Sequence, residues 1–257
     1  MKNPFIGSKT CFTDRGKLSR LILFSFCGML LFSWAARGDN GCVSCHQAPD
    51  FLVTNKKLYE YYQDWEASVH QQEGVSCVDC HGGLSDAGNK EDAHGKDIMH
   101  KVGYRSITST CGSCHMPIEE AFRTSEHFQQ IVVDKQEKLG PTCISCHASI
   151  NSTAIHVNQV RSICSHCHNR ETEIAPEVPA QSEKLLNRFL SIHRYYRYIV
   201  KRGDPEEVKS FFSTIDPKIE ELSSVWHSFD LVRIDEYTRA LFQQLKRKRM
   251  ELKNAEK

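Results

Sequence analysis

The sequence Cys42-Val43-Ser44-Cys45-His46 contains the pattern C-x-x-C-H, and this pattern occurs four more times along the chain. The complete set is Cys42, Cys45 and His46; Cys77, Cys80 and His81; Cys111, Cys114 and His115; Cys143, Cys146 and His147; and Cys164, Cys167 and His168. Two thiols at this spacing can form thioethers with the two vinyl groups of one haem, and the histidine that follows can bind its iron. The pattern therefore predicts five covalently bound haem c groups.

Disulfide pairing and zinc binding by cysteine pairs are the alternatives for such motifs. Neither requires a histidine directly after every second cysteine. The chain has 12 cysteines and 13 histidines in 257 residues. At those frequencies, chance would give roughly 0.03 C-x-x-C-H motifs in the whole chain. Five copies therefore favour haem attachment over both alternatives.

The overall composition is that of a globular protein with almost no net charge. Lysine and arginine number 33 against 32 aspartates and glutamates, and 40% of the residues are hydrophobic. This balance excludes a nucleic-acid-binding protein that works through gross positive charge, so no nucleic-acid partner is expected. The hydrophobic share also argues against a disordered chain.

Residues 1–35 have the pattern of a secretory signal peptide. Five basic residues precede an apolar run of 14 residues, 21–34, and Ser33-Trp34-Ala35 offers small residues where a signal peptidase cuts. The run is shorter than the ~20 residues that span a bilayer. We therefore expect a periplasmic or otherwise exported protein that begins near residue 36. A retained N-terminal anchor, with membrane association through that segment, is the alternative.

The pattern aromatic-x-x-Ser-x-His occurs twice, and each copy is followed by a glycine and then by a C-x-x-C-H motif. The two copies end in His70 and His127, and another histidine precedes the next motif: His94 or His100 in the first copy, His156 in the second. A second imidazole would make a haem iron six-coordinate, so that electron transfer would need little change in ligation. The repeat therefore nominates His70, His127, His156 and one of His94 or His100 as distal iron ligands. The alternative for each is a histidine that packs or faces solvent.

Beyond residue 170 the motifs stop and helical patterning begins. Apolar residues form one stripe over residues 181–201, where a helix is expected. Asp204-Pro205 and Asp216-Pro217 each have the pattern of a helix start, and the second is expected to open a long helix that finishes in the basic run 246–249. That run suits the negative end of a helix, and docking of an acidic partner or of anionic lipid is its alternative role.

Two histidines of this last third, His193 and His227, lie in the predicted helices. Either can be the fifth distal ligand, or a histidine that packs or caps a helix. His166, which lies inside its own motif, is expected to be a bystander.

The predicted fold is mainly α with much irregular loop, because no strand-like alternation occurs between the motifs. We expect a multihaem cytochrome c fold with a five-haem domain over residues 36–170 and a helical segment over 181–250 that packs on it. About 44 residues of exported chain would serve each haem, so much of the core would be porphyrin and folding would depend on the cofactor.

The chain resembles the multihaem c-type cytochromes related to hydroxylamine oxidoreductase and to the tetrahaem cytochrome that accepts its electrons. The resemblance rests on the Ser-x-His before Cys77-Val78-Asp79-Cys80-His81-Gly82-Gly83 and on Cys111-Gly112-Ser113-Cys114-His115, and it covers roughly residues 41–169. The C-terminal helices are similar to those that follow the haem region in relatives of hydroxylamine oxidoreductase and nitrite reductase. The resemblance implies electron transfer between periplasmic or membrane redox partners, either donor and acceptor cytochromes or a reductase.

Two other functions stay open at this point. One is an oxidoreductase that acts on a small nitrogen or sulfur compound at one open haem. Ammonia-forming nitrite reductases usually attach their catalytic haem by C-x-x-C-K, whereas all five motifs here end in histidine. The other is the quinol dehydrogenase subunit that an N-terminal anchor holds at the membrane. Since two axial histidines can be supplied to every haem, we expect an electron carrier and assign no catalytic residue.

Overall fold

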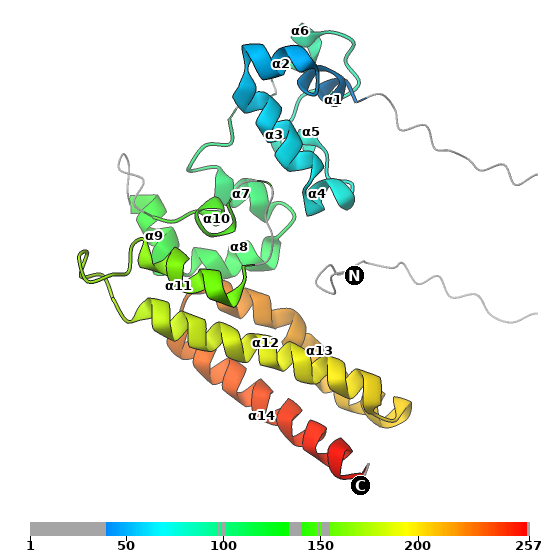
Figure 1. Ribbon diagram of the computed structural model, residues 1–257, viewed down its shortest axis with the longest axis vertical. Helices are drawn as coiled ribbons and strands as arrows, with labels where there is room; N and C mark the ends of the chain where they lie inside the picture. The colour runs from blue at the N-terminus through cyan, green and yellow to red at the C-terminus, as the bar shows by residue number, and fades with distance from the viewer. Residues whose placement is uncertain are drawn as a thin grey trace, which may run out of the picture. The chain divides into compact units, whose positions relative to one another are not determined.

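The computed structural model describes residues 40–96, 98, 101–133, 140–148, 150 and 155–255 (Figure 1). Within these residues the chain is mainly helical and has no strand, so the predicted fold class is confirmed. The helices are α1 (Gly41–His46), α2 (Pro49–Thr54), α3 (Lys56–Glu66), α4 (Val69–Gln72), α5 (Cys77–His81), α6 (Lys90–Ala93), α7 (Ile107–Gly112), α8 (Met116–Arg123), α9 (Glu126–Val133), α10 (Cys143–His147), α11 (Val157–Ser165), α12 (Val178–Arg202), α13 (Pro205–His227) and α14 (Leu231–Ala255). The predicted signal peptide and His100 lie outside the described residues.

Three of the five motifs are themselves single helical turns, α1, α5 and α10. Positions i, i+3 and i+4 of a helix share one face, so the two thiols and the imidazole of a motif project on the same side. Polar side chains start these short helices: Asn40 accepts the backbone N–H of Cys42 at 3.1 Å, and Ser145 accepts that of Thr142 at 2.9 Å. The remaining two motifs begin inside α7 and α11 and continue into the turn that follows.

The backbone conformation explains why the second residue after the Cys77 motif, Gly83, is a glycine. Its φ of 83° is in the left-handed region, and a Cβ there would lie 2.7 Å from the backbone oxygen of Ala93. The chain after α5 therefore passes against the end of α6 at a distance that only glycine permits.

The C-terminal helices contain most of the apolar core. Of the 16 buried hydrophobic residues in the described chain, 12 lie in α12, α13 and α14, and the least exposed include Ile192, Ile199, Ile215, Leu222 and Leu245. The three helices run beside one another in Figure 1, and they join the haem-motif region where α8 contacts α13 and α11 contacts α12. The region before residue 178 thus has few buried apolar side chains of its own, as expected for a core that haem completes.

The predicted helix over 181–201 corresponds to α12, which begins three residues earlier with Pro179 in its first turn. Asp204 caps α13 as predicted, since its Oδ1 accepts the N–H of Glu206 at 3.0 Å and that of Glu207 at 3.3 Å.

The predicted helix start at Asp216-Pro217 is wrong, because Pro217 lies inside α13. Proline inside a helix costs roughly 3 kcal/mol. Phe212, Ile215, Leu222 and Val225, on both sides of it, are all buried at helical spacing. Each contributes about 1.5–3 kcal/mol, so burial outweighs the missing hydrogen bond.

The last long helix starts instead at Leu231, where Asp230 Oδ1 accepts the N–H of Val232 at 3.1 Å and that of Arg233 at 3.0 Å. This helix, α14, continues to Ala255. The basic run 246–249 therefore lies within the helix, and the prediction that it finishes the helix is wrong.

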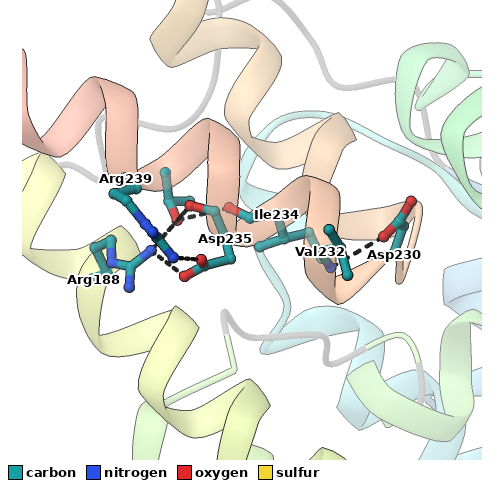
Figure 2. A network of polar contacts seen from close by, with 7 residues as sticks. Arg188, Asp230, Val232, Ile234, Asp235 and Arg239 are labelled. Carbon is teal, nitrogen blue, oxygen red and sulfur yellow. Dashed lines mark hydrogen bonds and ion pairs between the residues drawn. The ribbon is translucent and has the colours of Figure 1, made fainter.

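A polar network fixes α14 against α12 (Figure 2). Arg188 Nη1 donates to Asp235 Oδ1 at 2.6 Å, to the Asp235 carbonyl at 3.0 Å and to Thr238 Oγ1 at 3.2 Å. Arg239, one turn along α14, pairs with the other carboxylate oxygen of Asp235. Since Arg188 and Asp235 are both largely buried, the network sets the register of the two helices and with it the position of the turn that precedes α14.

No helix of the described chain combines the length and the apolar character needed to cross a bilayer.

Candidate haem-binding sites

The ten motif cysteines are free thiols, partly or fully exposed, and none forms a disulfide. Neighbouring motifs meet through them. The Cys77 thiol hydrogen-bonds to that of Cys42 and the Cys111 thiol to that of Cys143. Cys80 lies near Cys114, and Cys146 lies near Cys164. Each motif is therefore next to the motif that follows it in the chain, from the first to the fifth.

Burial and neighbouring thiols raise the pKa of several of these thiols. Burial, together with the Cys42 thiol, raises the pKa of Cys77 to about 11, and burial with the Cys164 thiol raises the pKa of Cys146 to about 11. Between Cys111 and Cys143, a hydrogen bond raises the pKa of Cys111, the donor, and lowers that of Cys143, the acceptor, to about 7.

Four motif histidines each face a second histidine from elsewhere in the chain. The pairs, with the distances between ring centroids, are His46 with His94 at 6.2 Å, His115 with His70 at 6.4 Å, His168 with His127 at 6.0 Å and His147 with His227 at 6.0 Å. A metal–imidazole bond is about 2.0 Å long and the nitrogen lies about 1.1 Å from the ring centroid, so two imidazoles on opposite sides of one metal have centroids roughly 6.2 Å apart. The four pairs have the separation that two axial ligands of one haem iron require.

Hydrogen bonds orient three of these rings. Nδ1 lies 3.3 Å from the Ile150 carbonyl in His70, 2.6 Å from the Ser223 carbonyl in His227, and 2.9 Å from the Ile174 carbonyl in His168. A ring that donates from Nδ1 keeps its lone pair on Nε2, which is the usual arrangement of a metal-binding histidine. The donor chemistry of these residues fits haem iron.

Burial keeps several of the paired imidazoles neutral, as a metal ligand must be. It lowers the pKa of His127 to about 4, with a smaller contribution from His168. Burial also lowers the pKa of His227 and of His115, and the partner histidine of each pair lowers it further.

The repeated aromatic-x-x-Ser-x-His pattern has a local structural reason. Ser68 and Ser125 are almost completely buried, with 1% and 2% exposure. Each hydroxyl donates to the carbonyl three residues earlier, of Trp65 or Phe122, at 2.6 Å and accepts the N–H three residues later, of Gln71 or Phe128, at 3.2 Å. Each serine thus caps the helix that carries the histidine of its copy, two residues further on.

The two copies also pair in the same way. His70 skips the Cys77 motif and faces His115 of the next one, and His127 skips the Cys143 motif and faces His168. The glycines differ, since a Cβ on Gly140 would lie 2.9 Å from the His127 carbonyl whereas a Cβ on Gly74 would have no neighbour within 4 Å, but the histidine pairing is the same. The repeat is therefore one of structure as well as of sequence.

The other predicted ligands have different positions. His81, the motif histidine outside these four pairs, lies near His46. His100, the alternative to His94 as a distal ligand, is outside the described residues. His156 is exposed and precedes α11 as its N-cap, and the described chain does not place it beside a motif histidine.

Two histidines near or within the C-terminal helices complete the set. His193 lies on α12 against Phe189, with ring centroids 4.9 Å apart. Burial lowers its pKa to about 4, with a smaller contribution from Arg197. His166 is exposed, and its Nδ1 lies 2.9 Å from the Ser162 carbonyl at the end of α11.

The sequence prediction missed Phe229. This residue joins α13 to α14 with a φ of 54°, and its ring contacts His127. No sequence pattern marks a bulky residue with left-handed backbone. Only a correct prediction of where α13 ends and α14 begins would have pointed to Phe229.

The motif turns and the histidine pairs define the class of protein, a c-type cytochrome with several haems. Comparison with known proteins supports this class. Residues 58–159 match the family model for cytochrome c552. The C-type polyheme cytochrome OmcB of Geobacter sulfurreducens is 30% identical over 120 residues, which are 44% of this chain and 14% of OmcB. The cytochrome c-type protein NrfH of Wolinella succinogenes is 28% identical over 123 residues, which are 48% of this chain and 55% of NrfH.

Over part of its length, the chain is similar to multihaem c-type cytochromes. The matched segment spans about half the length of NrfH and a seventh of that of OmcB. No solved structure matches the chain. The matches support the broad class of multihaem c-type cytochromes rather than the narrower hydroxylamine oxidoreductase group.

Proposed function

We propose that the chain is an exported pentahaem electron carrier, which binds one haem c at each C-x-x-C-H motif and passes single electrons between redox protein partners. The observation that carries the proposal is the set of four histidine pairs at 6.0–6.4 Å. Four haems would then have two protein ligands and no open position for a substrate, which favours a carrier over an enzyme. The fifth haem, on His81, would take its distal ligand from outside these four pairs.

The contacts between successive motifs support a continuous path. Because a cysteine of each motif lies near one of the next motif, haems attached to them would lie in one row, from the Cys42 motif to the Cys164 motif. His227 supports the same order, since it faces His147 and also lies near His115 of the preceding motif.

When bound, haem c supplies an iron that alternates between the ferrous and ferric states. The two cysteines of each motif would hold one haem through thioethers, and backbone carbonyls orient the rings of His70, His168 and His227, which would bind haem iron. Six-coordinate iron with fixed ligands changes little on reduction, so each transfer requires little rearrangement.

The charge distribution suggests the chemistry of a partner. Residues 40–177 contain 18 acidic and 11 basic residues, whereas 178–257 contain 12 acidic and 16 basic residues. A redox partner with a basic docking surface would therefore be attracted to the acidic haem-binding region. Donor and acceptor cytochromes, or a reductase, are the partners we propose.

Two measurements on the purified protein test this function. Denaturing mass spectrometry is expected to give the mass of the exported polypeptide plus five haems, with the N-terminus near residue 36. Magnetic resonance is expected to show only low-spin iron, and added cyanide is expected to leave the optical spectrum unchanged. Rapid cyanide binding at one haem of the native protein would contradict the carrier function and favour an enzyme, and fewer than five haems would contradict the pentahaem assignment.

A further inference from the structure

The turn between α13 and α14 holds an aromatic residue in an unfavourable backbone conformation. Phe229 has a φ of 54°, a region that residues with a bulky side chain rarely enter. Hydrogen bonds hold the turn on both sides of it. The Phe229 N–H donates to the Trp226 carbonyl at 3.2 Å, and the Asp230 N–H donates to Ser228 Oγ at 3.4 Å. Strain of this kind persists only where the surroundings enforce it, and it often marks a functional constraint.

The conformation directs the Phe229 ring at two distal histidines. Its centroid lies 4.6 Å from that of His127 and 6.2 Å from that of His227, with interplanar angles of 64° and 83°. Both are edge-to-face contacts, which aromatic rings favour. His127 faces His168, and His227 faces His147, so this one ring contacts the distal side of the fourth and the fifth motif.

His127 lacks the hydrogen bond that orients His227. Nδ1 of His227 lies 2.6 Å from the Ser223 carbonyl, whereas Nδ1 of His127 is buried and has no hydrogen-bond partner in the described chain. A metal-binding histidine almost always donates this N–H, and the bond fixes the ring plane. At His127 the ring plane must be fixed by packing instead, and the centroid of the Phe229 ring lies 4.6 Å from that of His127.

We propose that Phe229 is a positioning residue that fixes the imidazole planes of the distal ligands of the last two haems, at His227 and above all at His127. The proposal rests on the proposed function, in which these histidines bind iron. The angle between the two axial imidazole planes sets the splitting of the iron d orbitals in a low-spin haem, and thus its g values, and it contributes to the reduction potential. One side chain of the C-terminal helices would therefore tune two adjacent haems together.

The test is electron paramagnetic resonance of the oxidised holoprotein, with Phe229 changed to leucine, glycine or tyrosine. In Phe229→Leu and Phe229→Gly, the g values of two low-spin signals are expected to shift while those of the other haems stay unchanged. Phe229→Tyr keeps an aromatic ring and is expected to restore the wild-type values. Because glycine accepts the left-handed backbone, Phe229→Gly remains informative if the leucine variant fails to mature.

Phe242→Leu is the matched control. Phe242 stacks on Tyr195 in the core of the C-terminal helices, with ring centroids 5.3 Å apart. Its loss is expected to lower stability and to leave every g value unchanged. Unchanged signals in both Phe229→Leu and Phe229→Gly, or equal shifts at all haems, would overturn the proposal.

His127→Ala separates this proposal from the proposed function on which it rests. It is expected to convert one low-spin haem to high-spin. If it leaves every haem low-spin, the ligand assignment is wrong. If it gives the high-spin haem and the Phe229 variants have wild-type spectra, only the role of Phe229 is wrong.

Discussion

His227 is a residue of the C-terminal helices that faces a motif histidine. It ends α13, its Nδ1 is held by the Ser223 carbonyl, and its ring faces His147 at 6.0 Å. His166, by contrast, is exposed inside its own motif, and its Nδ1 lies near the carbonyls of its own helix. His227, a candidate ligand from the sequence, and His166, an expected bystander, thus differ in burial, in orientation and in the residues that they face.

We expect His227→Ala to convert one haem from low-spin to high-spin, because it would remove the distal ligand opposite His147. All five haems should stay attached, since the cysteines are unchanged. Optical and magnetic-resonance spectra of the oxidised protein measure the change. His166→Ala is the control and should have the wild-type spectrum. A wild-type spectrum for His227→Ala would show that the tail only packs and would reopen the question of a vacant haem.

At the scale of single elements, α13 shows how burial overrides a local signal. Asp216-Pro217 has the composition of a helix start, yet the helix continues through it because the apolar residues on both sides belong to one core. Pro205, at the first turn of the same helix, occupies a position where the missing N–H would have no helical partner. The same residue type is thus neutral at one site and costly twelve positions later.

Pro217→Ala is expected to raise the free energy of unfolding by about 1–3 kcal/mol, because it restores a helical hydrogen bond and removes the clash of the proline ring. Pro205→Ala, the control in the same helix, should change it by less than about 0.5 kcal/mol. Denaturant unfolding of the holoprotein, followed by circular dichroism, measures both values. An equal effect of the two substitutions would show that α13 already accommodates Pro217 without strain.

For the whole molecule, the five motifs suffice to predict the class of protein, because covalent attachment of haem demands fixed residues at fixed spacing. The serine of the repeat likewise marks His70 and His127, since it caps the helix that carries each of them. Which motif histidine each of them faces could not be predicted, because the two members of a pair are far apart in the sequence and several short helices lie between them. For the same reason the sequence names His227 and His193 as candidates for the fifth ligand without choosing between them, and it misses Phe229.

The distribution of the core leads to a prediction for the chain without haem. The helices α12, α13 and α14 hold 12 of the 16 buried hydrophobic residues that the structure describes, whereas the haem-motif region holds four. Without porphyrin, that region would bury too little apolar surface to offset the conformational entropy lost on folding. The C-terminal helices have a core of their own and the Arg188–Asp235 ion pair, so we expect them to fold in either form.

Hydrogen exchange with mass spectrometry, on chain produced without haem attachment and on the holoprotein, checks this expectation. Amide protection in residues 178–255 should persist in both forms, while protection in residues 40–165 should be lost without haem. A Cys143→Ala, Cys146→Ala double variant offers the intermediate case, with loss centred on α10 and its neighbour α7. If the haem-free chain kept full protection over α5, α7 and α10, the motif region would have a polypeptide core of its own, and haem would be bound to a preformed fold.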